Sequence, residues 1–130
     1  MSLDDALESA IGDVPDCVAG AVLDMTTGLV LAVSAQDPED EEAIESAAAA
    51  LPDLFEGGAF GGVAEAFGRE SDAAAGFSEF IVLGKKHVHL FLRNPSDPDQ
   101  VMSLVCRREA KIGMVLAKSR KTVEAVAAAV

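Results

Sequence analysis

The stretch that decides the fold spans residues 18–34 and reads VAGAVLD, then MTTG, then LVLAVS. Two apolar runs flank a short polar turn that ends in Gly28, a pattern that predicts a β-hairpin with a left-handed glycine. Because both runs are apolar on both faces, we expect this hairpin to be covered on both sides. None of its side chains is a reactive group, so the hairpin indicates scaffold rather than catalysis.

A short helix is predicted before the hairpin. Ser2 is suited to cap its start, and Pro15 to end it. Apolar residues recur there every three or four positions, which gives the helix one apolar face formed by Leu3, Leu7, Ile11 and Val14.

A longer helix is predicted after the hairpin. Asp37 is a good N-cap, Pro38 suits the first helical position, and the acidic run 39–42 complements the helix dipole. This run lacks the glycine turn of a calcium loop, so we expect a solvated helix start rather than a metal site. Pro52 and the glycines of residues 57–62 interrupt the pattern. We therefore predict either one kinked helix or two helices joined at the glycines.

The second half of the chain predicts a meander and a final helix. Strands are expected at 77–83, 87–93 and 101–106, with a loop at 94–99 and an amphipathic helix over 112–130. The element order is therefore α-β-β-α-β-β-β-α. It predicts an α+β fold with a single five-stranded, mostly antiparallel sheet covered by helices on both faces.

Charge is strongly divided along the 130 residues, whose net charge is −12. Residues 1–68 hold 15 acidic and no basic residues, whereas residues 69–130 hold 10 basic and 7 acidic residues. An acidic chain repels phosphates, so nucleic acid is not an expected partner. The two halves either lie beside each other or form a basic rim that meets a charged protein partner.

No pattern of reactive residues predicts an enzyme, a cofactor or a metal. Cys17 and Cys106 lie in apolar surroundings and are expected to be buried free thiols. His87 and His89 share one strand face without an evident third ligand, and the glycines of 57–62 lack the lysine of a phosphate loop. No apolar run is long enough for membrane insertion, so a cytoplasmic protein is expected.

The element order, together with the string VLD before the turn and GLVLA after it, resembles the roadblock/dynein-light-chain family, especially its small bacterial and archaeal members. The match covers residues 3–129, and Asp24 and Gly28 stand where that family has an acid before the turn and a glycine starting the second strand. Pro52, the nearby glycines and a longer segment before the third strand depart from the family pattern.

The resemblance implies a single roadblock-like domain over residues 1–130 that is not an enzyme. Such domains form homodimers or heterodimers through paired third strands and packed long helices, and they regulate or scaffold small Ras-like GTPases. We expect a homodimer, and the implied interface comprises Ala43, Ala47, Ala50, Phe77, Glu79, Phe80 and Ile81.

Two further expectations concern the binding partner. A basic rim of Arg107, Arg108 and Lys111 is the candidate contact for the GTPase partner. The alternative function is a small-molecule-binding sensor of similar architecture, which predicts a pocket under the long helix near Pro52.

Overall fold

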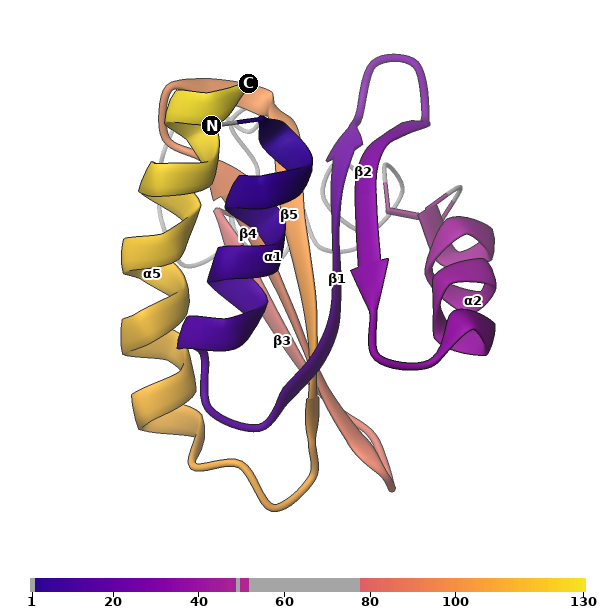
Figure 1. Ribbon diagram of the computed structural model, residues 1–130, viewed down its shortest axis with the longest axis vertical. Helices are drawn as coiled ribbons and strands as arrows, with labels where there is room; N and C mark the ends of the chain where they lie inside the picture. The colour runs from indigo at the N-terminus through magenta and orange to yellow at the C-terminus, as the bar shows by residue number, and fades with distance from the viewer. Residues whose placement is uncertain (1, 49, 52–77) are drawn as a thin grey trace, which may run out of the picture.

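The computed structural model describes residues 2–48, 50–51 and 78–130. Its helices and strands follow the predicted order (Figure 1): α1 (Leu3–Asp13), β1 (Cys17–Asp24), β2 (Leu29–Ala35), α2 (Pro38–Ala48), β3 (Glu79–Leu83), β4 (His87–Asn94), β5 (Asp97–Arg107) and α5 (Ile112–Ala129).

The five strands form one sheet in the order β2-β1-β5-β4-β3, and every neighbouring pair is antiparallel. The N-terminal hairpin and the C-terminal meander thus join through β1 and β5, which are far apart in sequence. Within the described part of the chain, this arrangement leaves β2 and β3 as the two edges of the sheet.

Helices cover the two faces unequally. On one face α1 and α5 pack against each other and against the sheet, around fully buried side chains such as Leu7, Leu90, Leu104 and Val115. On the other face α2 packs over β1 and β2 (Figure 1). The fold class and the two-sided cover predicted from the sequence are confirmed.

The hairpin turn is built as predicted. Gly28 has a φ of +73°, where residues with a side chain are strained. The Asp24 carboxylate accepts hydrogen bonds from the Thr26 backbone N–H at 2.9 Å and from the Thr26 hydroxyl at 2.6 Å. These bonds lower the pKa of Asp24. The acid before the turn therefore shapes the turn itself.

The expected cover on both sides of the hairpin holds for only one of its strands. Every residue of β1 except the last is buried. In β2, however, Leu29 and Leu31 are exposed. The prediction was wrong for β2 because this strand ends the sheet, which local sequence does not reveal.

Both helix starts are capped by the predicted side chains. The Ser2 hydroxyl accepts from the Asp5 N–H at 3.2 Å, and the Asp37 carboxylate accepts from the Glu39 N–H at 3.1 Å. The possible kink at Pro52 and the glycines of 57–62 lie outside the described residues.

Two boundaries in the second half differ from prediction. The predicted loop at 94–99 is a tight turn, because β5 already begins at Asp97. The Asn94 side chain closes this turn by accepting from the Ser96 N–H at 2.8 Å and donating to Gln100 at 3.2 Å. In α5 the predicted apolar stripe ends early, since Val130 lies beyond the helix and is exposed.

Candidate interaction surfaces

The edge strand β3 exposes apolar side chains on both of its faces. Ile81 and Leu83 lie on the face that α1 and α5 cover, opposite Leu90 and Val88 of β4. Val82 lies on the α2 face. Val82 is 43% exposed and Leu83 is 53% exposed.

The outer side of β3 also presents the backbone N–H and C=O groups of an edge strand. Among the described residues, β4 is the only strand that pairs with β3, and their register is regular from end to end. A regular, apolar edge strand is a template for a further strand.

An ion pair fixes the first residue of β3. The Arg120 guanidinium on α5 donates two hydrogen bonds to the Glu79 carboxylate, at 2.9 and 2.7 Å. These bonds lower the pKa of Glu79 and raise that of Arg120. The Glu79 carboxylate is therefore engaged within the chain, whereas the remainder of β3 carries the exposed apolar surface.

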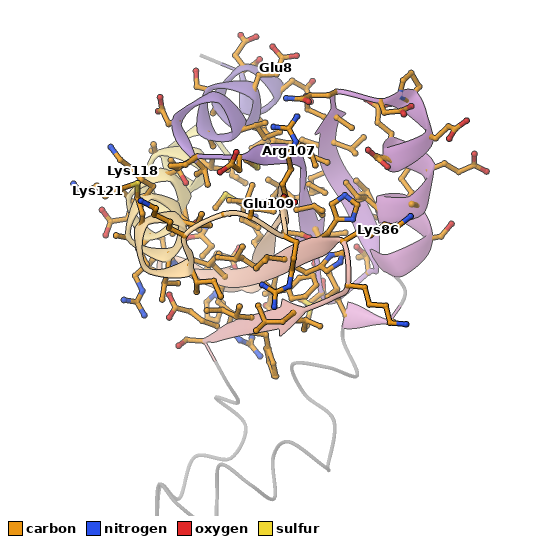
Figure 2. The ribbon with its side chains drawn as sticks, turned by 90° about the horizontal axis from the view of Figure 1, so that it is seen from below. Glu8, Lys86, Arg107, Glu109, Lys118 and Lys121 are labelled. Carbon is orange, nitrogen blue, oxygen red and sulfur yellow. The ribbon has the colours of Figure 1, made fainter. Side chains whose placement is uncertain are left out.

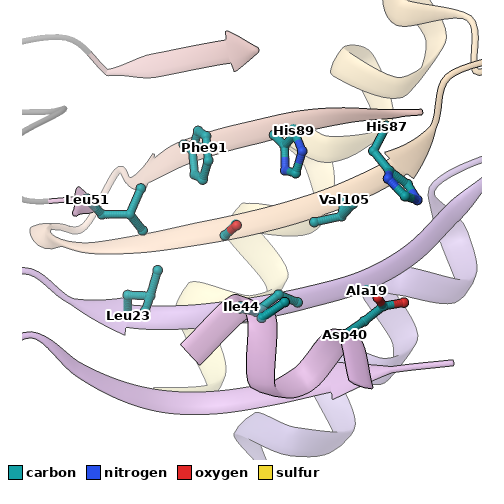
Figure 3. Close-up of a pocket in the computed structure, with 11 residues that line it drawn as sticks. Ala19, Leu23, Asp40, Ile44, Leu51, His87, His89, Phe91 and Val105 are labelled. Carbon is teal, nitrogen blue, oxygen red and sulfur yellow. The ribbon is translucent and has the colours of Figure 1, made fainter. Parts of the chain in front are cut away.

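A cavity of about 190 Å³ lies between α2 and the open half of the sheet (Figure 3). Ile44 and Asp40 of α2 border it on one side, and His87, His89 and Phe91 of β4 border it on the other. The sheet beyond β1 is therefore only partly covered on this face, where residues of β1, β4 and β5 line the cavity.

The two histidines form a row with Phe91 along β4. The ring centroids of His87 and His89 are 6.4 Å apart, and His89 stacks on Phe91 with a centroid distance of 6.5 Å and an angle of 9°. Burial, with a smaller contribution from His87, lowers the pKa of His89. In the described part of the chain, no cluster of three His, Cys, Asp or Glu residues is suited to hold a metal.

The structure describes two of the three alanines of the predicted interface in full. Ala43 is exposed on α2 at the border of the cavity, and Ala50 is exposed just after the helix. Ala47 lies in α2, but its side chain is outside the described part of the structure, as is the whole of Phe77. Phe80 is half-buried on the α2 face beside Phe91.

All three residues of the predicted rim are exposed: Arg107 ends β5, and Arg108 and Lys111 lie in the connection between β5 and α5. The Arg107 guanidinium lies 3.9 Å from the Asp16 carboxylate. The Arg108 N–H donates to the Lys86 carbonyl at 3.1 Å, which holds this connection against the β3–β4 turn.

The predicted rim is thus part of a larger set, which we call the basic end: Lys85, Lys86, Arg107, Arg108 and Lys111. Figure 2 labels Lys86 and Arg107 of this set. Sequence reasoning missed the two lysines. Lys85 and Lys86 belong to the predicted hairpin turn Gly84–Lys86. The sequence around that turn gives no sign that the turn contacts Arg108.

Two expectations drawn from composition can be compared with the structure. Cys17 and Cys106 are both buried and free, as predicted. No helix in the described segments has the length and apolar character needed to cross a lipid bilayer.

Comparisons with known proteins show what this fold resembles. No protein-family model and no curated protein matches the sequence. A Roadblock/LC7 domain from Streptomyces avermitilis matches the structure with a TM-score of 0.70 and 20% identity, covering 97% of this chain and 95% of that one.

Two MglB structures are also similar. Myxococcus xanthus MglB has a TM-score of 0.74 and 15% identity, covering 97% of this chain and 92% of its own. An MglB described as having a tetrameric arrangement has a TM-score of 0.75 and 17% identity, covering 98% and 86%. At such identities the likeness shows the fold, and the resemblance expected from the sequence is confirmed at that level.

Proposed function

We propose that this chain is a single, non-enzymatic, roadblock-like domain over residues 1–130 that forms a dimer and regulates or scaffolds a small Ras-like GTPase. The observation that carries the proposal is the regular, apolar and exposed edge strand β3 in a fold shared with Roadblock/LC7 domains. An edge of this kind left unpaired would promote aggregation, so a specific partner strand is the favoured state.

The strand that pairs with the outer side of β3 is most simply β3 of another copy of this chain. Antiparallel pairing across a two-fold axis would bring the same residues of both copies together, as an isologous interface requires. It would also bring the partly covered α2 faces of the two sheets side by side. Helix α2 with Ala43, and the row of His89 and Phe91, would then face the second copy. The tetrameric MglB arrangement supports the idea that this fold assembles with itself.

The basic end is the proposed contact for the GTPase. It gathers five cations on a chain whose net charge is −12, and in the described part of the chain one ion pair joins it to an acid, Arg107 with Asp16 at 3.9 Å. Complementary charge raises the rate at which two proteins meet and orients them on encounter. Such a surface fits the acidic side of a protein partner in the cytoplasm.

Light scattering tests the dimer, and binding tests the partner. At micromolar concentration the purified chain should have twice the mass of the monomer. It should also bind at least one of a panel of small Ras-like GTPases from the same organism, loaded with GDP or with a non-hydrolysable GTP analogue. A strictly monomeric chain contradicts the dimer, and an intact dimer that binds no GTPase contradicts the partner.

A matched pair of variants locates the GTPase contact. Arg108→Glu/Lys111→Glu should slow association with the GTPase roughly tenfold at low salt and flatten its salt dependence. Lys118→Glu/Lys121→Glu changes the net charge equally but lies along α5 (Figure 2), and it should have little effect. Equal effects from both variants would show that only net charge matters.

The cavity supports the alternative function, a small-molecule sensor. Its lining of Ile44, Leu23 and Phe91 with two histidines would suit a compact, largely apolar ligand. At about 190 Å³ it is smaller than the range typical of ligand sites, roughly 300–1,000 Å³, which favours the dimer instead. A small apolar compound that raises the melting temperature without changing the mass of the assembly would favour the sensor.

A further inference from the structure

Cys17 and Cys106 face each other at one end of the β1–β5 ladder. They are register partners on neighbouring antiparallel strands and form the last matched pair of that ladder. The Arg107 N–H donates to the Asp16 carbonyl at 2.9 Å. This bond lies just outside the pair and identifies Cys17 and Cys106 as a non-hydrogen-bonded pair, the kind in which opposite side chains approach most closely.

The separation expected for such a pair suits a disulfide. The Cα atoms of a non-hydrogen-bonded antiparallel pair are about 4.5 Å apart, within the range that disulfides span. The strand twist increases locally, because a bulge follows directly between Cys17 and Ala19.

The two thiols already interact, and they are not equivalent. The interaction with Cys106 lowers the pKa of Cys17, whereas the interaction with Cys17 and burial raise the pKa of Cys106. The Cys17 thiol donates a hydrogen bond to the Ala19 carbonyl at 3.4 Å. Cys17 is 5% exposed, while Cys106 is fully buried. Cys17 is therefore the thiol that ionises first and that a small reagent reaches first. Its position at the end of the ladder also makes local opening cheaper than at the centre of β1.

We propose that Cys17 and Cys106 form a reversible oxidation site that closes into a disulfide when a hydroperoxide oxidises Cys17. In the first step the Cys17 thiolate attacks hydrogen peroxide and becomes a sulfenic acid, and hydroxide leaves and is protonated to water. In the second step the Cys106 thiol attacks the Cys17 sulfur, and the sulfenic oxygen leaves as a second water molecule. Two electrons pass from the two cysteines to one peroxide, and a thiol reductant reverses the change.

The disulfide would tie β1 to β5 at the root of the basic end. Cys106 directly precedes Arg107, and Cys17 directly follows its acidic neighbour Asp16. The disulfide would close a loop of roughly 90 residues. Closing so long a loop removes much conformational entropy from the unfolded chain. The inference does not depend on the proposed GTPase partner, because it rests on the register and the thiols alone.

Peptide mapping after peroxide treatment tests the site. The folded, full-length chain is treated with hydrogen peroxide at a few equivalents, quenched with an alkylating reagent, and digested without reductant. We expect a linked pair of peptides that contain Cys17 and Cys106, a mass loss of about 2 Da for the two hydrogens removed, and monomeric mobility per chain in a denaturing gel. Reductant should restore both thiols.

Single-cysteine variants provide the controls. Cys106→Ser should leave Cys17 able to form a sulfenic acid that a dimedone probe traps, whereas Cys17→Ser should leave Cys106 largely unreactive. The proposal is overturned if both thiols in the wild-type chain stay reduced. It is equally overturned if they reach only sulfinic or sulfonic acids, or if the disulfides formed link different chains.

Discussion

The two edges of the sheet have similar composition but differ in their geometry. Both β2 and β3 are apolar, and both expose leucine, with Leu29 61% exposed and Leu83 53% exposed. In β2 the register shifts opposite Val22 and Leu23, which makes Leu31 an extra, unpaired residue in a bulge. In β3 the register is uninterrupted, and Arg120 holds its first residue in place.

A bulge bends and twists an edge so that another strand fits it poorly, whereas a regular edge accepts one readily. The comparison indicates that β2 is a protected edge and β3 an edge available for pairing. Exposed apolar area alone would not have distinguished the two.

The largest effect is expected from a charge placed on β3. Val82→Lys should weaken dimerisation roughly 100-fold, because pairing would bury a lysine without a counter-ion. Leu29→Lys adds the same charge to the other edge and should leave the dimer intact. Analytical ultracentrifugation over a concentration series measures the dimer dissociation constant of each variant, and circular dichroism checks that both variants are folded. If Leu29→Lys were the more damaging change, the assignment of the two edges would be reversed.

A smaller effect is expected from the turn that carries β2. Gly28→Ala places a side chain at a φ of +73° and should lower the free energy of unfolding by about 1 kcal/mol, without changing the mass of the assembly. Gly12→Ala is the matched control: it lies in α1, and nothing lies within 4 Å of its added methyl group. It should raise stability by up to about 1 kcal/mol. Urea denaturation of both variants checks the opposite signs.

The smallest effect concerns the anchor of β3 and its pH dependence. The bonds from Arg120 hold the pKa of Glu79 below its ordinary value of 4.5. The ion pair therefore stabilises the folded chain fully at pH values above 4.5. This stabilisation is lost as the pH falls through the lower pKa that Glu79 has in the folded chain. The loss is small, because Arg120 is exposed and solvent screens the pair.

Comparison of Glu79→Gln with the wild-type chain measures this contribution. The melting temperatures of the two should differ at pH 7 and converge as the pH approaches 3. A difference that stayed constant with pH would show that the carboxylate charge does not matter. A difference that grew at low pH would contradict the lowered pKa.

The sequence by itself determined the features that depend on near neighbours. The hairpin, its left-handed Gly28, the caps at Ser2 and Asp37, and the order of elements all follow from local rules of turn chemistry and periodicity. The error at 94–99 was also local in origin. Pro98 indicates a loop, but it has no register partner in either neighbouring strand, so its missing N–H costs no ladder bond.

Only the tertiary structure decided which strands lie at the edges and which distant residues meet. The pairing of β1 with β5 brings Cys17 opposite Cys106, leaves β2 and β3 outermost, and is not encoded in any short window of sequence. The contact between Lys86 and Arg108 likewise completes the basic end from two separate turns. Such pairings depend on how the whole chain buries its apolar faces, which is a property of all the elements together.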